Sequence, residues 1–258
     1  MLKDGKYVYC IIESEYDCNF GAIGIGEDNP LVTTIGLDGL CMVVSNHTLN
    51  KFVVNPENIL NHQKVIEKVM QEFNAVIPVR FGTVAATPDE IRNLLQCRYR
   101  EFSETLRAFE NKVEINVKGI WKNMDTIFQE IDAQNAEIQK IREEVEREPE
   151  SGKKEEKMYN AGHIIQKALD EKKKQEAEQI LTAFNRSVFD FKQNKIKDDN
   201  MFMNVAFLIN SGREKEIDNI MDDLGECYKD RIDFIYTAPI PIFSFVDLRI
   251  LPEEWEID

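Results

Sequence analysis

The segment from residue 122 to residue 192 limits what this chain can fold into. Glycine and proline occur in it only at Pro149, Gly152 and Gly162, and charged side chains are dense. Its apolar residues form two narrow stripes at helical spacing, while its charges are typical of a solvated face. We therefore predict two long helices that turn near Pro149–Gly152 as a helical hairpin. The stripes comprise Ile127, Ile131, Ile138, Ile141 and Val145, then Ile164, Ile165, Leu169, Ala177, Ile180, Leu181, Phe184, Val188 and Phe189.

The residues before this segment alternate between strand and helix patterns. Asp38-Gly39 is a hairpin signal between two apolar runs, and Thr87-Pro88-Asp89-Glu90 has the pattern of a helix start with a capping box. Helices are predicted over about 55–73 and 87–111. The predicted strands are Tyr7–Glu13, Val32–Gly36, Leu40–Ser45 and Val76–Ala85. Residues 1–111 are therefore predicted to form a variant ferredoxin-like domain, in which helices cover one face of a sheet.

A second sheet is predicted around the long helices. Val113–Val117 alternates apolar and polar residues before the helices, and Met201–Asn210 is a nearly continuous apolar run after them. A short amphipathic helix and two strands around a proline-rich turn close the chain. The fold class is therefore α+β with two domains: residues 1–111, and residues 112–258 with long helices at about 122–192 and a closing sheet.

The charge balance restricts the partners that this chain can bind. The chain has 32 Lys and Arg residues against 47 Asp and Glu residues, a net charge of −15. Such a surface repels phosphate backbones and anionic lipid, so we expect neither nucleic acid nor membrane as a partner. No run approaches the length of a membrane helix and the N-terminus has no apolar signal region, so a cytoplasmic location is predicted.

No pattern of catalytic or metal-ligating residues is apparent. The three histidines lie far apart in sequence, and no pair of cysteines or histidines has metal-ligand spacing. Cys10, Cys41 and Cys97 fall within strand or helix patterns, where a buried free cysteine is the usual finding. We therefore predict no metal, no cofactor and no enzymatic activity.

Several stretches, in order along nearly the whole chain, resemble the GvpF/GvpL gas vesicle proteins. The most specific is Pro78–Thr83, within VIPVRFGTVA, which is close to the Pro-x-Arg-Phe-Gly-Thr core of the family. The C-terminal motif departs from the family pattern at Ala238, Ile240 and Phe243. The other matching stretches are YVYCII, GLDGLCMVVSN, VEINVKGIW, KMYNAGHIIQKALDEK and YTAPIPIFSFV.

This resemblance implies a role in building gas vesicles. It implies an accessory or minor structural protein, located at the gas vesicle, that binds the main shell protein GvpA and other gas vesicle proteins. Binding would limit the aggregation of GvpA or help to nucleate the shell, because exposed apolar surfaces and strand edges aggregate. F-type and L-type members are not distinguished by these residues. The residues also leave open a small-ligand-sensing α+β protein or a cysteine-dependent enzyme.

The candidate partner site is the face of Val76–Ala85 that carries Pro78, Arg80 and Gly82. Strict alternation would pack Ile77, Val79, Phe81 and Thr83 under the helices. Pro78 would restrict pairing near a sheet edge, and Gly82 would leave room beside Arg80. Tyr7 and Tyr9 would lie on the same type of open surface. Arg80 would hold a carboxylate or carbonyl of the partner or, alternatively, form a salt bridge to the second domain.

Overall fold

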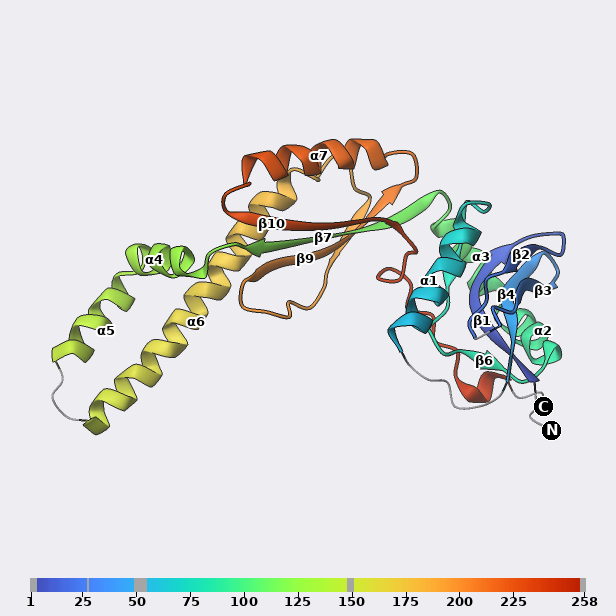
Figure 1. Ribbon diagram of the computed structural model, residues 1–258, viewed down its shortest axis with the longest axis horizontal. Helices are drawn as coiled ribbons and strands as arrows, with labels where there is room; N and C mark the ends of the chain where they lie inside the picture. The colour runs from blue at the N-terminus through green and yellow to red at the C-terminus, as the bar shows by residue number, and fades with distance from the viewer. Residues whose placement is uncertain (1–3, 27, 49–54, 148–150, 256–258) are drawn as a thin grey trace. The chain divides into compact units, whose positions relative to one another are not determined.

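The computed structural model describes residues 4–26, 28–48, 55–147 and 151–255 and confirms the α+β class. Its contacts divide the chain into two compact units (Figure 1). Unit 1 comprises Met1–Glu114, Leu208–Ser211 and Pro239–Asp258, and unit 2 comprises Ile115–Phe207 and Gly212–Ala238. The segment from Pro239 onward thus groups with the N-terminal part of the chain, whereas the sequence placed it with residues 112–258.

The sheet of unit 1 is antiparallel and has the order β2-β3-β4-β1-β5, with β6 also pairing with β1. The predicted hairpin is confirmed, because Asp38 and Gly39 both have positive φ between β3 and β4. Four strands precede the first helix, with β1 beside β4, which departs from the β-α-β-β-α-β order of a ferredoxin-like domain. The strands are β1 (Asp4–Glu13), β2 (Asn19–Ala22), β3 (Leu31–Leu37), β4 (Leu40–Thr48), β5 (Ile77–Pro78) and β6 (Val84–Ala85).

A bulge in β1 changes which of its side chains share a face. The register between β1 and β4 shifts between Val8 and Cys10. Beyond the bulge, Cys10 joins Tyr7 and Tyr9 in one core cluster, while Ile11 joins Val8 in the other. The alternation of a regular strand over Tyr7–Glu13 is therefore broken after Tyr9, because the extra residue of a bulge inverts the pattern.

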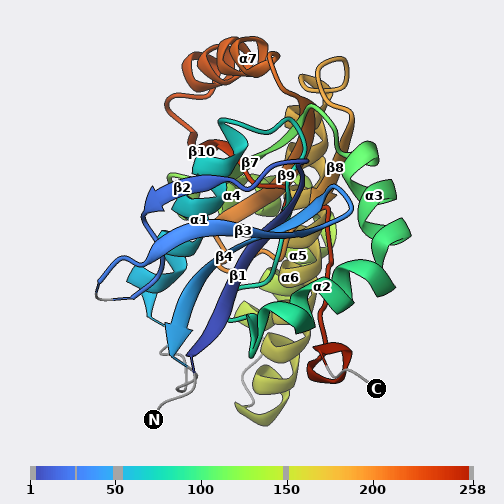
Figure 2. The same cartoon turned by 90° about the vertical axis from the view of Figure 1, so that its right-hand side faces the viewer.

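Helices cover both faces of this sheet, so the prediction of helices on one face is wrong (Figure 2). Helix α1 (Pro56–Met70) packs Val65, Ile66 and Val69 against the tyrosine side of β1. Helices α2 (Pro88–Cys97) and α3 (Tyr99–Ala108) pack on the Val8 side. The Thr87 cap is confirmed by a 3.2 Å hydrogen bond from the Glu90 N–H, but the predicted helix to about Asn111 breaks at Arg98.

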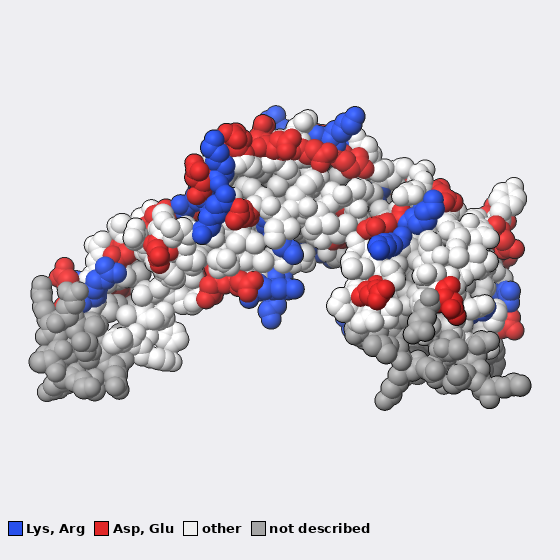
Figure 3. Space-filling model, in the orientation of Figure 1, with Lys and Arg blue, Asp and Glu red and all other residues white. Residues whose placement is uncertain are grey.

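The sheet of unit 2 has the order β10-β7-β9-β8, and the unit boundary falls within its three long strands. Strand β9 lies against β7, and the bonds from Trp121 N–H to Asn200 O and from Ser211 N–H to Asn111 O make this pair antiparallel. Helix α7 (Glu214–Cys227) follows β9 and carries carboxylates along its outer side (Figure 3). The strands are β7 (Lys112–Trp121), β8 (Asp190–Gln193), β9 (Met201–Asn210) and β10 (Ile232–Ile240).

The long segment forms two helical arms, as predicted. The first arm is α4 (Met124–Gln134) followed by α5 (Ala136–Arg147), and the second is α6 (Ser151–Thr182), which contacts both. Part of the predicted turn, residues 148–150, lies outside the described residues. The prediction of helix up to about residue 192 is wrong, because α6 ends at Thr182 and β8 begins at Asp190. A short 3-10 helix, η1 (Pro252–Trp255), ends the described chain.

A group of charges in unit 2 attaches the arms to the sheet. The Arg231 guanidinium donates to both oxygens of Glu130, at 2.6 and 2.8 Å, and to Glu176 at 2.5 Å. Trp121 Nε1–H donates to Glu176 at 2.7 Å. Hydrogen bonds from Arg231 lower the pKa of Glu130 to about 2. Since these side chains come from α4, α6, β7 and the residue just before β10, the group holds these elements together.

Gly119 in β7 provides a test of how tightly unit 2 is packed. A Cβ at this position would lie 2.5 Å from Cζ of Phe202, whose ring stacks on Trp121 and is buried. Gly119→Ala should therefore lower the free energy of unfolding by about 1–3 kcal/mol in urea denaturation. Gly162→Ala on α6 is the control, because nothing lies within 4 Å of its added Cβ. A Gly119→Ala protein as stable as the parent would contradict this packing.

Candidate functional site

The candidate site is a turn, not the continuous strand predicted for Val76–Ala85. Within this segment only β5 and β6 pair with β1 as strands. Val79 and Thr83 each keep one backbone hydrogen bond to β1, and residues 80–82 between them form the turn. Thr83 donates its N–H to Arg80 O at 3.3 Å and its hydroxyl to the same oxygen at 2.8 Å. Gly82 has a φ of +88°. Glycine is therefore required by the backbone of the turn, not to leave room beside Arg80.

Two buried side chains, which we call the Tyr7–His62 clamp, hold this turn. His62 Nε2 lies 3.0 Å from Val79 O, and since a carbonyl only accepts, Nε2 donates. His62 Nδ1 therefore accepts the Tyr7 hydroxyl proton at 3.0 Å, and the Tyr7 oxygen accepts the Gly82 N–H at 2.9 Å. One unbroken chain of hydrogen bonds thus runs from the Gly82 N–H to the Val79 carbonyl.

Burial sets the charge state of the clamp. It lowers the pKa of His62 to about 4 and raises the pKa of Tyr7 above its usual range. At neutral pH both groups are therefore uncharged, which is the state that this hydrogen-bond chain requires. The sequence offered one signal for His62, because its spacing from Val65, Ile66 and Val69 places it in the apolar stripe of the predicted helix.

The structure separates the predicted site residues into buried and exposed ones. Tyr7 and Tyr9 are 0% exposed, so the expectation of an open aromatic face is wrong. Tyr9 accepts the Ile25 N–H and bonds to Ser45, both at 2.8 Å. Pro78 is buried in β5, which is the last strand in the order of this sheet. Pro78 therefore lies at a sheet edge, as expected. Arg80 and Gly82 alone among the five are exposed.

Arg80 forms a salt bridge at the surface of unit 1. Its Nη2 lies 2.6 Å from Asp247 Oδ1, and its side chain is 59% exposed. The sequence predicted, as one alternative, a bridge from Arg80 to the second domain, residues 112–258. Asp247 lies in that range, but its segment belongs to unit 1 together with Arg80. Asp247 also pairs with Arg249 at 3.1 Å. Exposed pairs of this kind contribute about 0–1 kcal/mol, so the bridge alone adds little to stability.

The C-terminal segment that carries Asp247 is anchored by buried contacts. The buried carboxylate of Glu114 accepts the N–H and the hydroxyl of Ser244, both at 2.7 Å. Leu248 and Trp255 enter the core on the α2 and α3 side. The position of Asp247 beside Arg80 is therefore fixed independently of the exposed bridge.

The remaining reactive groups show no catalytic arrangement within the described residues. Burial raises the pKa of the Cys41 thiol to about 11 and that of Cys10 above its usual range, which disfavours the nucleophilic thiolate. No group of three or more metal-ligating side chains gathers in the ranges that the structure describes. Nor is any helix in those ranges long and apolar enough to span a bilayer.

Comparison with known proteins gives consistent matches over almost the whole chain. The family described as gas vesicle synthesis protein GvpL/GvpF matches residues 5–247. Gas vesicle protein F of Microcystis aeruginosa (strain PCC 7806) is 22% identical and covers 95% of this chain and 98% of its own length. Gas vesicle protein L1 of Halobacterium salinarum is 23% identical, with coverage of 95% and 91%. The crystal structure of GvpF from Anabaena sp. PCC7120 has the same fold, with a TM-score of 0.78, 21% identity, and coverage of 96% of this chain and 100% of that one.

The clamp predicts an acid-sensitive step in stability. The pKa of His62 is about 4 in the folded protein against 6.5 when exposed, so the unfolded chain takes up the proton first. The stabilisation is therefore complete above pH 6.5 and is lost as the pH falls to 4, by about 3 kcal/mol in all. Urea denaturation across this range measures it.

His62→Gln is the control for this pH dependence, because glutamine can donate and accept hydrogen bonds without titrating. The variant should lack the loss between pH 6.5 and 4, even if it is less stable at neutral pH. An unchanged pH profile in His62→Gln would contradict the assignment.

Proposed function

The chain belongs to the GvpL/GvpF gas vesicle synthesis family, and on that premise we propose that it is a non-enzymatic assembly factor. It binds the main shell protein GvpA and limits its aggregation or helps to nucleate the shell. A protein that polymerises through apolar surfaces is prone to aggregate before assembly, so a binding partner that covers those surfaces has a direct physical use.

The observation that carries the proposal is that Arg80 has a fixed backbone and an exposed side chain. Its backbone is tied by the Tyr7–His62 clamp and by Thr83, while its guanidinium is largely exposed. A fixed backbone lowers the entropy lost when a partner binds. The planar guanidinium can donate two parallel hydrogen bonds to a carboxylate or can bond to backbone carbonyls. Arg80 is therefore suited to hold an acidic side chain or a carbonyl of the shell protein.

Asp247 pairs with Arg80 until the partner binds. Because the pair is exposed, exchanging Asp247 for a carboxylate of the partner loses only about 0–1 kcal/mol of bridge energy. The buried Glu114–Ser244 contacts keep the C-terminal segment in place during such an exchange. This supports a recognition role for Arg80, while the salt bridge remains the structural alternative.

Arg80→Ala tests the recognition role. Loss of a charge-assisted hydrogen bond should weaken capture of GvpA by about 10-fold or more, measured by pull-down from co-expressing cells and normalised to folded protein. The free energy of unfolding should fall by less than about 1 kcal/mol. Arg80→Lys should retain only part of the binding, because it keeps the charge without the fork.

Arg100→Ala is the matched control. Arg100 is also an exposed arginine of unit 1, 90% exposed and paired with Glu104 at 2.7 Å, and it should leave capture unchanged. If Arg80→Ala lowers stability while capture per folded molecule stays the same, Arg80 serves only its salt bridge. If the parent protein captures no GvpA, the proposed function itself fails.

A further inference from the structure

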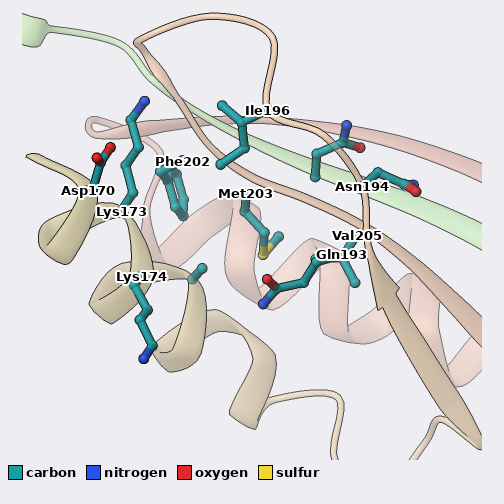
Figure 4. A pocket seen from close by; sticks show the side chains of 11 residues that line it. Asp170, Lys173, Lys174, Gln193, Asn194, Ile196, Phe202, Met203 and Val205 are labelled. Atoms are coloured by element: carbon teal, nitrogen blue, oxygen red, sulfur yellow. The ribbon is translucent and has the colours of Figure 1, made fainter.

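Strand β8 (Asp190–Gln193) is an open edge of the unit 2 sheet. It ends the strand order β10-β7-β9-β8, so that within the described ranges it pairs only with β9. All four of its residues are exposed. A groove of about 300 Å³ lies between Gln193, at the end of the strand, and Lys174 of α6, so this helix does not cover the strand there (Figure 4). Main-chain groups on the outer side of β8 are therefore accessible to another strand.

The main chain of Phe191 points to this open edge. Its N–H donates to Oδ1 of the preceding Asp190 at 2.8 Å. The short Asp190 side chain can accept this N–H only on the side of the strand that β9 does not occupy. In an antiparallel ladder the N–H and the C=O of one residue point to the same side, so both groups of Phe191 face outward. The Asp190 carboxylate thus lies where the main chain of a further strand would bond.

Two aromatic side chains make this edge apolar. Phe191 is 44% exposed, and Phe189, directly before the strand, is 68% exposed. The Phe191 ring lies against the buried Phe207, with ring centroids 6.3 Å apart, so its position is held from inside the unit. An exposed edge strand with apolar side chains favours pairing with another strand.

The sequence of β8 indicates what the pairing strand is. Phe191 is flanked by one acidic residue, Asp190, and one basic residue, Lys192. When two copies of β8 run antiparallel with Phe191 opposite Phe191, Asp190 of each copy lies opposite Lys192 of the other. Side chains opposite each other have Cβ atoms about 4.5–5.5 Å apart, which is close enough for an ion pair. A twofold arrangement forms this pair twice, so β8 is complementary to itself.

We propose that β8 pairs with β8 of a second copy of this chain and joins two unit 2 sheets into one. The Phe191 N–H of each copy donates to the Phe191 carbonyl of the other. The Asp190 carboxylate moves from that N–H to the Lys192 ammonium of the other copy. The two Phe191 rings meet on one face, and Phe189 of each copy enlarges the apolar contact. In the alternative, the short length of the strand and its charges protect the edge against pairing.

A dimer would carry two Arg80 turns. It then binds a shell protein that presents many copies of one surface with higher apparent affinity than a single chain, provided that both turns reach the shell. This consequence rests on the proposed function, whereas the pairing itself does not and is tested without a shell protein.

Sedimentation equilibrium of the full chain between about 1 and 200 µM tests the pairing, because a strand of four residues gives a small interface and a weak dimer. We expect a Kd of about 10–100 µM. The Phe191 amide, followed by NMR-detected hydrogen exchange, should become more protected as the dimer forms, which would place the contact at β8.

Asp190→Lys and Lys192→Asp test the charge pairs. Each variant places like charges opposite each other at both positions, so it should weaken self-association by about 10-fold or more. An equimolar mixture of the two variants restores opposite charges at both positions and should form a heterodimer as readily as the parent chain dimerises. This rescue would also show that both variants are folded.

Asp222→Lys is the matched control. Asp222 is an exposed carboxylate on α7 of the same unit, and its replacement changes the net charge by the same amount as Asp190→Lys. It should leave the dimer unchanged.

Three results would overturn the proposal. The first is that the parent chain stays monomeric at the highest concentration, which would leave the edge protected or open only to a strand of another protein. The second is that both single variants dimerise as well as the parent, which would place the contact elsewhere. The third is that the mixture does not associate although circular dichroism shows both variants to be folded.

Discussion

The hydrogen bonds that run from Gly82 through Tyr7 and His62 to Val79 are the interaction on which the exposed turn that carries Arg80 depends. It connects β1, α1 and the turn that carries Arg80, and each donor in it meets an acceptor. Because the groups are buried, losing one link would leave a polar group without a partner and destabilise the fold. These hydrogen bonds thus fix the backbone of the exposed turn from its buried side, and the side chain of Arg80 takes no part in them.

The contacts that stabilise each unit are therefore made by other residues than those of the proposed recognition site. The clamp, the Glu114–Ser244 contacts and the Arg231 group are buried or half-buried and hold the elements of each unit. Arg80 and Asp247 lie at the surface, where an ion pair is easily exchanged. Arg80 is thus an exposed cation in a chain whose net charge is strongly negative.

Local patterns in the sequence predicted much of the fold. The Asp38-Gly39 hairpin and the Thr87 cap depend on a few neighbouring residues, and the helical arms depend on a long run without helix breakers. The errors arise where distant contacts override a local pattern. The bulge at Tyr9 inverts the alternation of β1, and α1 covers the face on which the tyrosines lie. Neither is visible in the spacing of residues.

Hydrogen exchange at the Gly82 amide tests the central claim most directly. Gly82 is exposed and lies in a turn, so without the clamp its N–H would exchange rapidly. The account predicts that NMR-detected exchange finds this amide protected to a similar degree as the amides of β1, and that Tyr7→Phe removes the protection at Gly82 while the protein stays folded. Rapid exchange at Gly82 in the parent protein, or protection unchanged in Tyr7→Phe, would contradict the account.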